Sequence, residues 1–104
     1  MARNTKSRRP AEVFPPGRFL REELESREWS QSDLARVLGR PVQAINEIIN
    51  AKKRITPETS IALAAALDTD PMFWLNLEIA YRVWLAGDPD PKIAQRARKL
   101  EHAS

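Results

Sequence analysis

The stretch from 31 to 50 constrains this chain most, because small and apolar residues recur in it at fixed spacing. Ala35 lies four residues before Gly39, and Ile45 lies six residues after it. A small residue at 35 allows a second helix to approach, and a glycine at 39 can adopt the positive φ that ends a helix. Ile45 and Ile48 would then bury the back of the second helix. The pattern predicts two short helices that cross at a tight turn, a helix-turn-helix.

The opposite face of the second of these helices is polar. It leaves five side chains free, namely Gln43, Ala44, Asn46, Glu47 and Asn50. Amides on a short helix can hydrogen-bond to base edges in the major groove of DNA. We therefore expect base contacts from Gln43, Ala44, Asn46 and Glu47. The alternatives are an ordinary polar surface, a backbone contact for Asn46 and an ion pair between Glu47 and a nearby arginine.

Positive charge gathers beside this helix. The 104 residues carry a net charge of +3, of which residues 1–14 supply all, so the remaining 90 residues are balanced. Between 33 and 54, however, five basic side chains face two acidic ones. DNA phosphates would lie there. We expect phosphate contacts from Gln31, Arg40, Asn50, Lys52, Lys53 and Arg54, the alternative being a solvated charged face. Four such cations per protomer would give a dimer a log–log salt slope of about −7.

The rest of the chain predicts helices only, so the expected fold class is all-α. Pro15-Pro16-Gly17 breaks the chain before a helix that runs from about Gly17 to Arg27. Capping signals then start further helices, with Ser30 and Asp33 as a capping box, Thr56-Pro57 and Asp70-Pro71. The predicted bounds are 30–38, 41–50, 56–67 and 70–86. Five helices therefore form one helix-turn-helix domain, residues 15–87.

Two flanking segments complete the predicted organisation. Residues 1–14 are predicted to be a flexible basic arm, which could be disordered, touch DNA through Arg8 and Arg9, or wrap a protein partner. Residues 88–104 carry Ile93, Ala97 and Leu100 on one stripe. This C-terminal segment either forms a short amphipathic helix or frays.

The fifth helix predicts a dimer. From 72 to 86 its apolar residues surround the whole cylinder, and a helix that is apolar on all sides needs cover on all sides. Four other short helices cannot supply that cover, so we expect one face to meet a second copy across a two-fold axis. The predicted interface residues are Phe73, Trp74, Leu77, Tyr81 and Trp84, since aromatic residues suit interface anchors. The alternative is a fully internal helix.

Composition excludes several function classes. Cysteine is absent and His102 is the single histidine, so we expect no disulfide, no metal site and no cofactor. No apolar run approaches the roughly 20 residues of a membrane span, and no secretory signal is present. We also expect no enzyme, because the chain lacks a nucleophile–base constellation and a glycine-rich phosphate loop. A reducing cytoplasm fits this composition.

Three further strings narrow the interpretation. They are Ile45-Asn46-Glu47-Ile48-Ile49-Asn50, Ile55-Thr56-Pro57-Glu58-Thr59 and Phe73-Trp74-Leu75-Asn76-Leu77. With the helix-turn-helix residues, they resemble the Cro/CI-like (XRE) family, and within it the HigA-type antitoxins of bacterial toxin–antitoxin modules. The resemblance covers about residues 16–85. Two positions depart from the family pattern: Arg40 stands where an apolar residue is usual, and Ala51 where glycine is frequent.

The resemblance implies a function. Members of that family bind palindromic operator DNA as homodimers, repress their own operon and neutralise a RelE-like toxin that cuts mRNA. They act in the bacterial cytoplasm, at the nucleoid. Two alternatives stay open. One is a stand-alone phage-type repressor without a toxin, and the other is an all-α module in which the helix-turn-helix contacts only protein.

Overall fold

The computed structural model of the protein describes residues 13–103, which form six helices. They are α1 (Pro16–Arg27), α2 (Gln31–Leu38), α3 (Val42–Ile49), α4 (Pro57–Leu67), α5 (Phe73–Ala86) and α6 (Pro91–Ala103). No strand occurs in that part of the chain. The predicted all-α class is therefore confirmed, but the helices number six rather than five.

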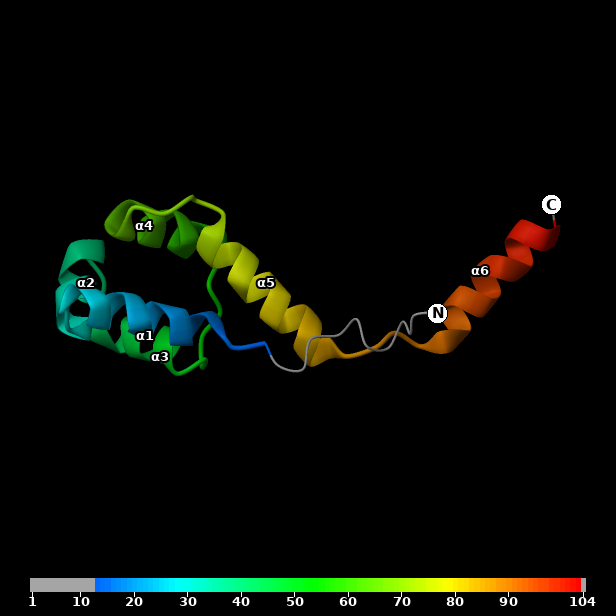
Figure 1. Ribbon diagram of the computed structural model, residues 1–104, viewed down its shortest axis with the longest axis horizontal. Coiled ribbons are helices and arrows are strands. Elements are labelled where there is room, and N and C mark those ends of the chain that lie inside the picture. The colour runs from blue at the N-terminus through cyan, green and yellow to red at the C-terminus, as the bar shows by residue number, and fades with distance from the viewer. Residues whose placement is uncertain (1–12, 104) are drawn as a thin grey trace.

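The first four helices and the start of α5 surround a single core (Figure 1). α2 packs on α3 and α4, α1 packs on α3 and α5, and α4 packs on α5. The side chains of the core come from all five of these helices and from one connection: Leu20, Leu24, Leu34, Ala35, Ile45, Ile48, Ile49, Ile55, Leu63, Leu67 and Trp74. α5 then leads away from this core, and α6 lies beyond it.

Two of the three capping signals in the sequence, at Ser30 and at Thr56, form as predicted. Ser30 Oγ accepts a hydrogen bond from the Asp33 backbone N–H at 3.0 Å, and Asp33 Oδ2 accepts one from the Ser30 N–H at 2.8 Å. Hydrogen bonds to the Asp33 carboxylate from the backbone and the side chain of Ser30, helped by the charge of Arg36, lower the pKa of Asp33. Gly39 ends α2 with φ 68°, and Thr56 caps α4 by accepting from the Thr59 N–H. Local sequence thus fixes where α2 and α4 begin.

α1 begins inside the predicted chain break. Pro16 occupies its first turn, where a proline costs no helical hydrogen bond. Gly17 follows as a buried helical residue that faces the end of α3. A Cβ placed on Gly17 would lie 2.4 Å from the carbonyl oxygens of both Ile48 and Ile49. The glycine is therefore required by the close crossing of α1 over α3.

α5 begins at Phe73, later than the Asp70-Pro71 signal predicted. Asp70 Oδ1 accepts from the Met72 N–H at 2.7 Å, and the Asp70 carbonyl accepts from the Phe73 N–H at 3.0 Å. These bonds hold residues 70–72 as a turn, because the aspartate side chain competes with the helix for its backbone donors. The helix ends at Ala86 before Gly87, as predicted.

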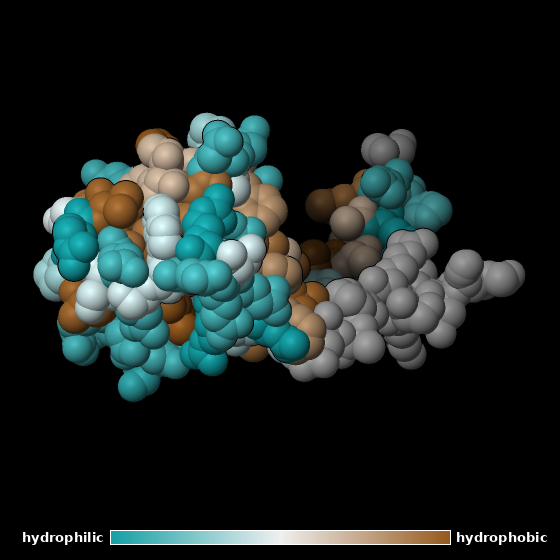
Figure 2. All heavy atoms as spheres, turned by 60° about the vertical axis from the view of Figure 1, so that its left-hand side comes forward, coloured by the Kyte–Doolittle hydropathy of each residue, from teal (hydrophilic) through white to brown (hydrophobic). Residues whose placement is uncertain are grey.

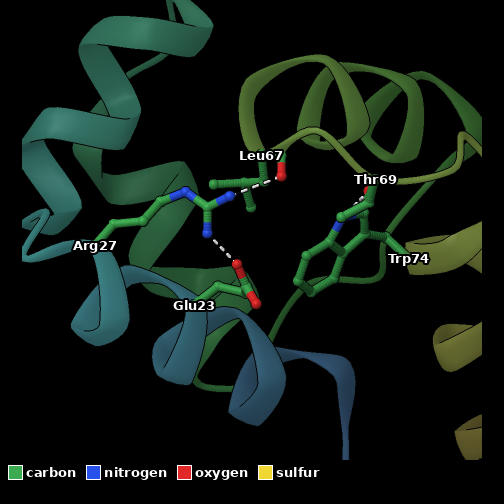
Figure 3. Close-up of polar contacts among 5 residues, drawn as sticks. All are labelled: Glu23, Arg27, Leu67, Thr69 and Trp74. Carbon is green, nitrogen blue, oxygen red and sulfur yellow. Dashed lines mark hydrogen bonds and ion pairs between the residues drawn. The ribbon is translucent and has the colours of Figure 1, made fainter.

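Hydrogen bonds from Arg27 and Trp74 hold the segment between α4 and α5 against the core (Figure 3). The Arg27 guanidinium donates to the Leu67 carbonyl oxygen at 2.8 Å and pairs with Glu23 on its own helix. The indole N–H of Trp74 donates to Thr69 Oγ1 at 3.0 Å. Each polar group that these bonds satisfy lies beside the core, where an unpaired donor would be costly.

The C-terminal segment is a helix of 13 residues, so the fraying alternative is not observed. Its side chains from 91 to 102 are all exposed, including Ile93 at 55% and Leu100 at 76%. Figure 2 shows apolar atoms on this separate helix. The predicted arm lies largely outside the described residues, since only 13 and 14 of it are described. There, the Arg18 guanidinium lies 3.8 Å from the centroid of the Phe14 ring.

Candidate nucleic-acid interface

α3 has one buried face and one exposed polar face. Ile45 is fully buried, and Ile48 and Ile49 are buried beside it, so the back of the helix is fixed in the core. The five side chains that the sequence left free lie toward the surface: Gln43, Asn46 and Asn50 are exposed, and Ala44 and Glu47 are half-buried. The structure thus brings together the four residues for which base contacts were predicted.

Hydrogen bonds connect this polar face with the start of α2. Asn46 Nδ2 donates to Gln31 Oε1 at 3.3 Å, and Asn50 Nδ2 donates to the Asn46 carbonyl oxygen at 3.0 Å. Gln31 is the first residue of α2, whose N-terminal N–H groups favour an anion. The predicted phosphate contact at Gln31 therefore lies next to the predicted base contact at Asn46.

Glu47 lies between a lysine, which offsets its charge, and a glutamine amide, which donates a hydrogen bond to it. Lys53 Nζ lies 3.5 Å from Glu47 Oε1, and Gln43 Nε2 lies 3.5 Å from Glu47 Oε2. The alternative ion pair for Glu47 is thus observed, with a lysine in place of the arginine. Such an exposed pair adds little stability. It does, however, place a cation beside the one carboxylate of this face, which would otherwise repel phosphate.

A basic loop follows α3. Lys52, Lys53 and Arg54 are all exposed, and we call these three residues the basic loop. The N–H groups of Lys52 and Lys53 both donate to the Glu47 carbonyl oxygen, at 2.8 and 3.2 Å. The backbone of the loop is therefore folded back on α3 while its three cationic side chains remain accessible.

Ala51 allows the chain to turn into this loop at a conformational cost. It has a φ of 60°, in the left-handed region that favours glycine. The position is one where the resembled family frequently has glycine, so the structure gives a reason for that preference. Alanine carries the strain of the turn here.

Arg40 is directed elsewhere. It is half-buried, and its guanidinium donates to Thr59 Oγ1 at 2.8 Å, near the start of α4. Arg40 thus joins the turn before α3 to α4. Its predicted phosphate contact remains a prediction, and the geometry separates it from the three side chains of the basic loop.

The predicted dimer residues divide into different groups. Trp74 is fully buried in the core of its own protomer, so it has no surface to offer a second copy, and its interface prediction is wrong. Phe73 is 40% exposed and meets the Trp74 ring edge-on, with centroids 4.9 Å apart. Leu77, Tyr81 and Trp84 are half-buried. Aromatic content alone did not show which side of α5 faces the core.

One exposed stripe of α5 is formed by residues that the sequence pattern did not single out as an interface. Asn76, Ile79, Ala80 and Val83 are all exposed and lie at i, i+3, i+4 and i+7, and we call them the α5 seam. Ile79 is 50% exposed and Val83 is 65% exposed. This spacing places them on one helical stripe. The same spacing was present in the sequence, but apolar residues on every side of the helix hid it.

Membrane spans and metal clusters are both absent from the part of the chain that the structure describes. Between 13 and 103, no helix has the length and apolar character needed to cross a membrane. Within the same residues, no group of three or more histidine, cysteine, aspartate or glutamate side chains is placed to hold a metal ion.

Sequence comparison places the interface within a known motif. A family described as helix-turn-helix matches residues 20–74. An uncharacterised HTH-type transcriptional regulator of Haemophilus influenzae is 39% identical over 79 residues, which are 75% of this chain and 71% of that protein. The antitoxin HigA-1 of Vibrio cholerae is 37% identical over 83 residues, which are 79% of this chain and 74% of that protein.

Structural comparison agrees with the sequence comparison. An addiction module antidote protein of a HigA family from Coxiella burnetii has a TM-score of 0.69 and 32% identity, and the match covers 89% of this chain and 96% of that one. The Pseudomonas aeruginosa antitoxin HigA, solved with the higBA promoter, has a TM-score of 0.69 and 29% identity, with 88% and 94% covered. These matches extend beyond the helix-turn-helix itself.

Proposed function

This chain belongs to the helix-turn-helix family and, as its sequence predicted, resembles HigA-type antitoxins, and from that premise we propose that it is the antitoxin of a type II toxin–antitoxin module. As a homodimer it binds palindromic operator DNA and represses its own operon, and it neutralises a RelE-like, mRNA-cleaving toxin. One observation carries the proposal: the exposed amide face of α3 lies beside the basic loop, while the back of α3 is locked in the core.

Base reading is assigned to the exposed face of α3. Gln43 can bridge an adenine, Asn46 can accept and donate at a base edge or the backbone, and Ala44 can contact a thymine methyl group. Glu47 can accept from cytosine while Lys53 offsets its charge. A helix held rigidly from behind presents these groups without reordering, which lowers the entropic cost of binding.

Phosphate binding is assigned to the residues that flank this face. Gln31 acts at the N-terminus of α2, and Asn50 and the basic loop act beyond the C-terminus of α3. Three loop cations in each protomer of a dimer give a salt slope of about −5, and a contribution from Arg40 as well gives about −7. The slope therefore reports whether Arg40 leaves Thr59 when DNA binds.

Dimerisation is assigned to the α5 seam. Ile79 and Val83 expose apolar surface on a stripe that includes the small residue Ala80, which allows close approach of a second helix. A two-fold pairing of seams would place the two α3 helices in successive major grooves about 34 Å apart. Phe73, Leu77, Tyr81 and Trp84 then lie at the margins of the interface rather than at its centre.

The DNA-binding half is tested by a gel shift with the DNA upstream of the gene and with a mixed-sequence duplex. Gln43→Ala should weaken binding to the operator by about fivefold to 150-fold per contact, from about 1–3 kcal/mol of discrimination, and leave mixed-sequence binding nearly unchanged. Gln95→Ala on α6 is the matched control, since it removes an exposed glutamine away from α3. Equal losses on both duplexes would show that Gln43 does not read bases.

The antitoxin half is supported by the similarity to the Vibrio cholerae and Coxiella burnetii proteins and is tested separately. Co-expression with the product of the neighbouring gene should give a stable complex, and the chain should restore growth of cells that express that product. If the neighbouring gene encodes no small basic toxin, the stand-alone phage-type repressor becomes the better interpretation. If no duplex is bound at all, the module that contacts only protein replaces both.

A further inference from the structure

Glu78 is buried on the core side of α5. It is 5% exposed, and between residues 13 and 102 no other charged side chain is buried. A buried carboxylate is costly unless its oxygens accept hydrogen bonds and its charge is paired. The functions assigned above to α3, the basic loop and the α5 seam do not use this residue.

Both carboxylate oxygens of Glu78 have partners. Oε1 accepts from the backbone N–H of Ile55 at 3.0 Å, and Oε2 accepts from Nε of Arg82, one turn further along α5. The bond to Ile55 joins residues 23 positions apart in the chain. Glu78 thus joins α5 to the segment between α3 and α4.

Ile55 is the residue that directly follows the basic loop. Its side chain is 2% exposed and belongs to the core. At the other end of the loop, the Glu47 carbonyl oxygen holds the N–H groups of Lys52 and Lys53. The loop is therefore anchored at both ends, by α3 on one side and by Glu78 on the other, while its three cationic side chains stay exposed.

We propose that Glu78 is a positioning residue for phosphate binding: by holding the Ile55 N–H, it fixes the backbone of the basic loop where the DNA strand passes. The proposal rests on the proposed function, because it needs a duplex to bind. Preorganised cations lose less conformational freedom on binding than mobile ones. Because Glu78 and Ile79 are neighbours on α5, the anchor of the loop lies beside the α5 seam.

Two variants separate the hydrogen bond from the charge. Glu78→Gln keeps an oxygen that can accept from the Ile55 N–H, whereas Glu78→Leu removes it. Glu101→Leu, which removes the same charge from exposed α6, is the matched control. Affinity is measured for the upstream duplex and for a mixed-sequence duplex at several salt concentrations, below the unfolding temperature of each variant.

Glu78→Leu should bind both duplexes at least tenfold more weakly, with a salt slope that is shallower by about 0.9 for each phosphate that the loop no longer binds. Glu78→Gln should stay within about threefold of the wild type, as should Glu101→Leu. A purely structural role would lower the unfolding temperature of Glu78→Leu without changing the slope, and that result would contradict the proposal. A folded Glu78→Leu protein with wild-type affinity and slope likewise overturns it.

A measurement on the wild type keeps the test decisive if Glu78→Leu does not fold. Hydrogen exchange of the free protein should show the Ile55 amide protected at least tenfold more than the amide of Arg54, before DNA is added. An unprotected Ile55 amide overturns the proposal, since the loop would not be held in advance. If the wild type binds no duplex under any condition, the proposed function itself fails, and that result is distinct from a variant that binds like the wild type.

Discussion

The two halves of α5 differ in how many of their side chains lie in the core. The first half places Trp74 and Glu78 in the core, and each has a polar partner in its own protomer. The second half exposes Ile79, Val83 and Leu85, at 50%, 65% and 50%. The side chains of α5 that reach the core are thus satisfied within the protomer, whereas Ile79, Val83 and Leu85, like the apolar side chains of α6, leave apolar surface exposed.

This difference assigns distinct roles to apolar residues on one helix. A residue in the first half stabilises the protomer whether or not a second copy is present. An exposed residue of the second half, such as Val83, contributes little to the protomer and would contribute only in the proposed dimer. Substitutions in the two halves should therefore differ both in magnitude and in their dependence on protein concentration.

The largest expected effect is at Trp74. Trp74→Ala should lower the free energy of unfolding by about 3–5 kcal/mol, because it empties a fully buried site and leaves Thr69 without the indole donor. Urea denaturation at several protein concentrations measures it. Phe73→Ala, at a 40% exposed neighbour, is the control and should cost less. A small loss of stability together with dissociation of the dimer would place Trp74 at the interface after all.

Gly17 tests how closely α1 packs against α3. Gly17→Ala should destabilise the protomer by about 2–3 kcal/mol, since the added methyl group would meet the Ile48 and Ile49 carbonyl oxygens and push α1 away from α3. Thermal or urea unfolding measures the loss, with Ser26→Ala on the exposed side of α1 as control. A stability gain from better helix propensity would mean that α1 and α3 can separate freely.

Val83 tests the exposed second half of α5. Val83→Glu should weaken the proposed dimer by about 2 kcal/mol, or about thirtyfold in dissociation constant, and change protomer stability by less than about 0.5 kcal/mol. Sedimentation equilibrium measures the first and urea unfolding of the monomer the second. Leu100→Glu on α6, where the side chain is 76% exposed, sharpens the comparison. Equal dissociation by both variants would extend the interface from the α5 seam to α6.

The smallest effect is expected at Ala51. Ala51→Gly should raise the free energy of unfolding by about 0.5–1 kcal/mol, because relief of the positive φ outweighs the greater freedom of glycine in the unfolded chain. Thermal unfolding checks the sign. Ala65→Gly, at an exposed position inside α4, should destabilise instead. A loss at Ala51 would show that the strain of this turn is negligible.

Local sequence signals allowed most of the bounds of α2, α3 and α4 to be predicted. The capping box at Ser30 and Asp33, the positive φ at Gly39 and the Thr56 cap each depend on residues within one helical turn, so the sequence alone defines them. The buried back of α3 followed from helical spacing, and of the residues left on its other face the structure exposes Gln43, Asn46 and Asn50. The helical spacing of the sequence therefore predicted the candidate interface on α3.

Long-range packing decided the features that could not be predicted. Gly17 looked like part of a chain break because the carbonyl oxygens that require it belong to residues more than thirty positions away. The orientation of α5 was not encoded in its own pattern, since an all-round apolar helix has no preferred face. The burial of Glu78 depends on a hydrogen bond from Ile55, which lies 23 positions away in the chain. The role of Arg40 likewise depends on the distant Thr59.

The division of α3 into a buried back and an exposed front has an evolutionary consequence on the proposed function. Ile45 and Ile48 are buried and stabilise the fold, while Gln43 and Asn46 are exposed and make only surface hydrogen bonds, so their substitution should change stability by no more than about 0.5 kcal/mol. Descendants of this gene can therefore exchange the front residues at little thermodynamic cost and acquire a new promoter preference. Paralogous copies within one genome could in this way diverge until neither silences the other.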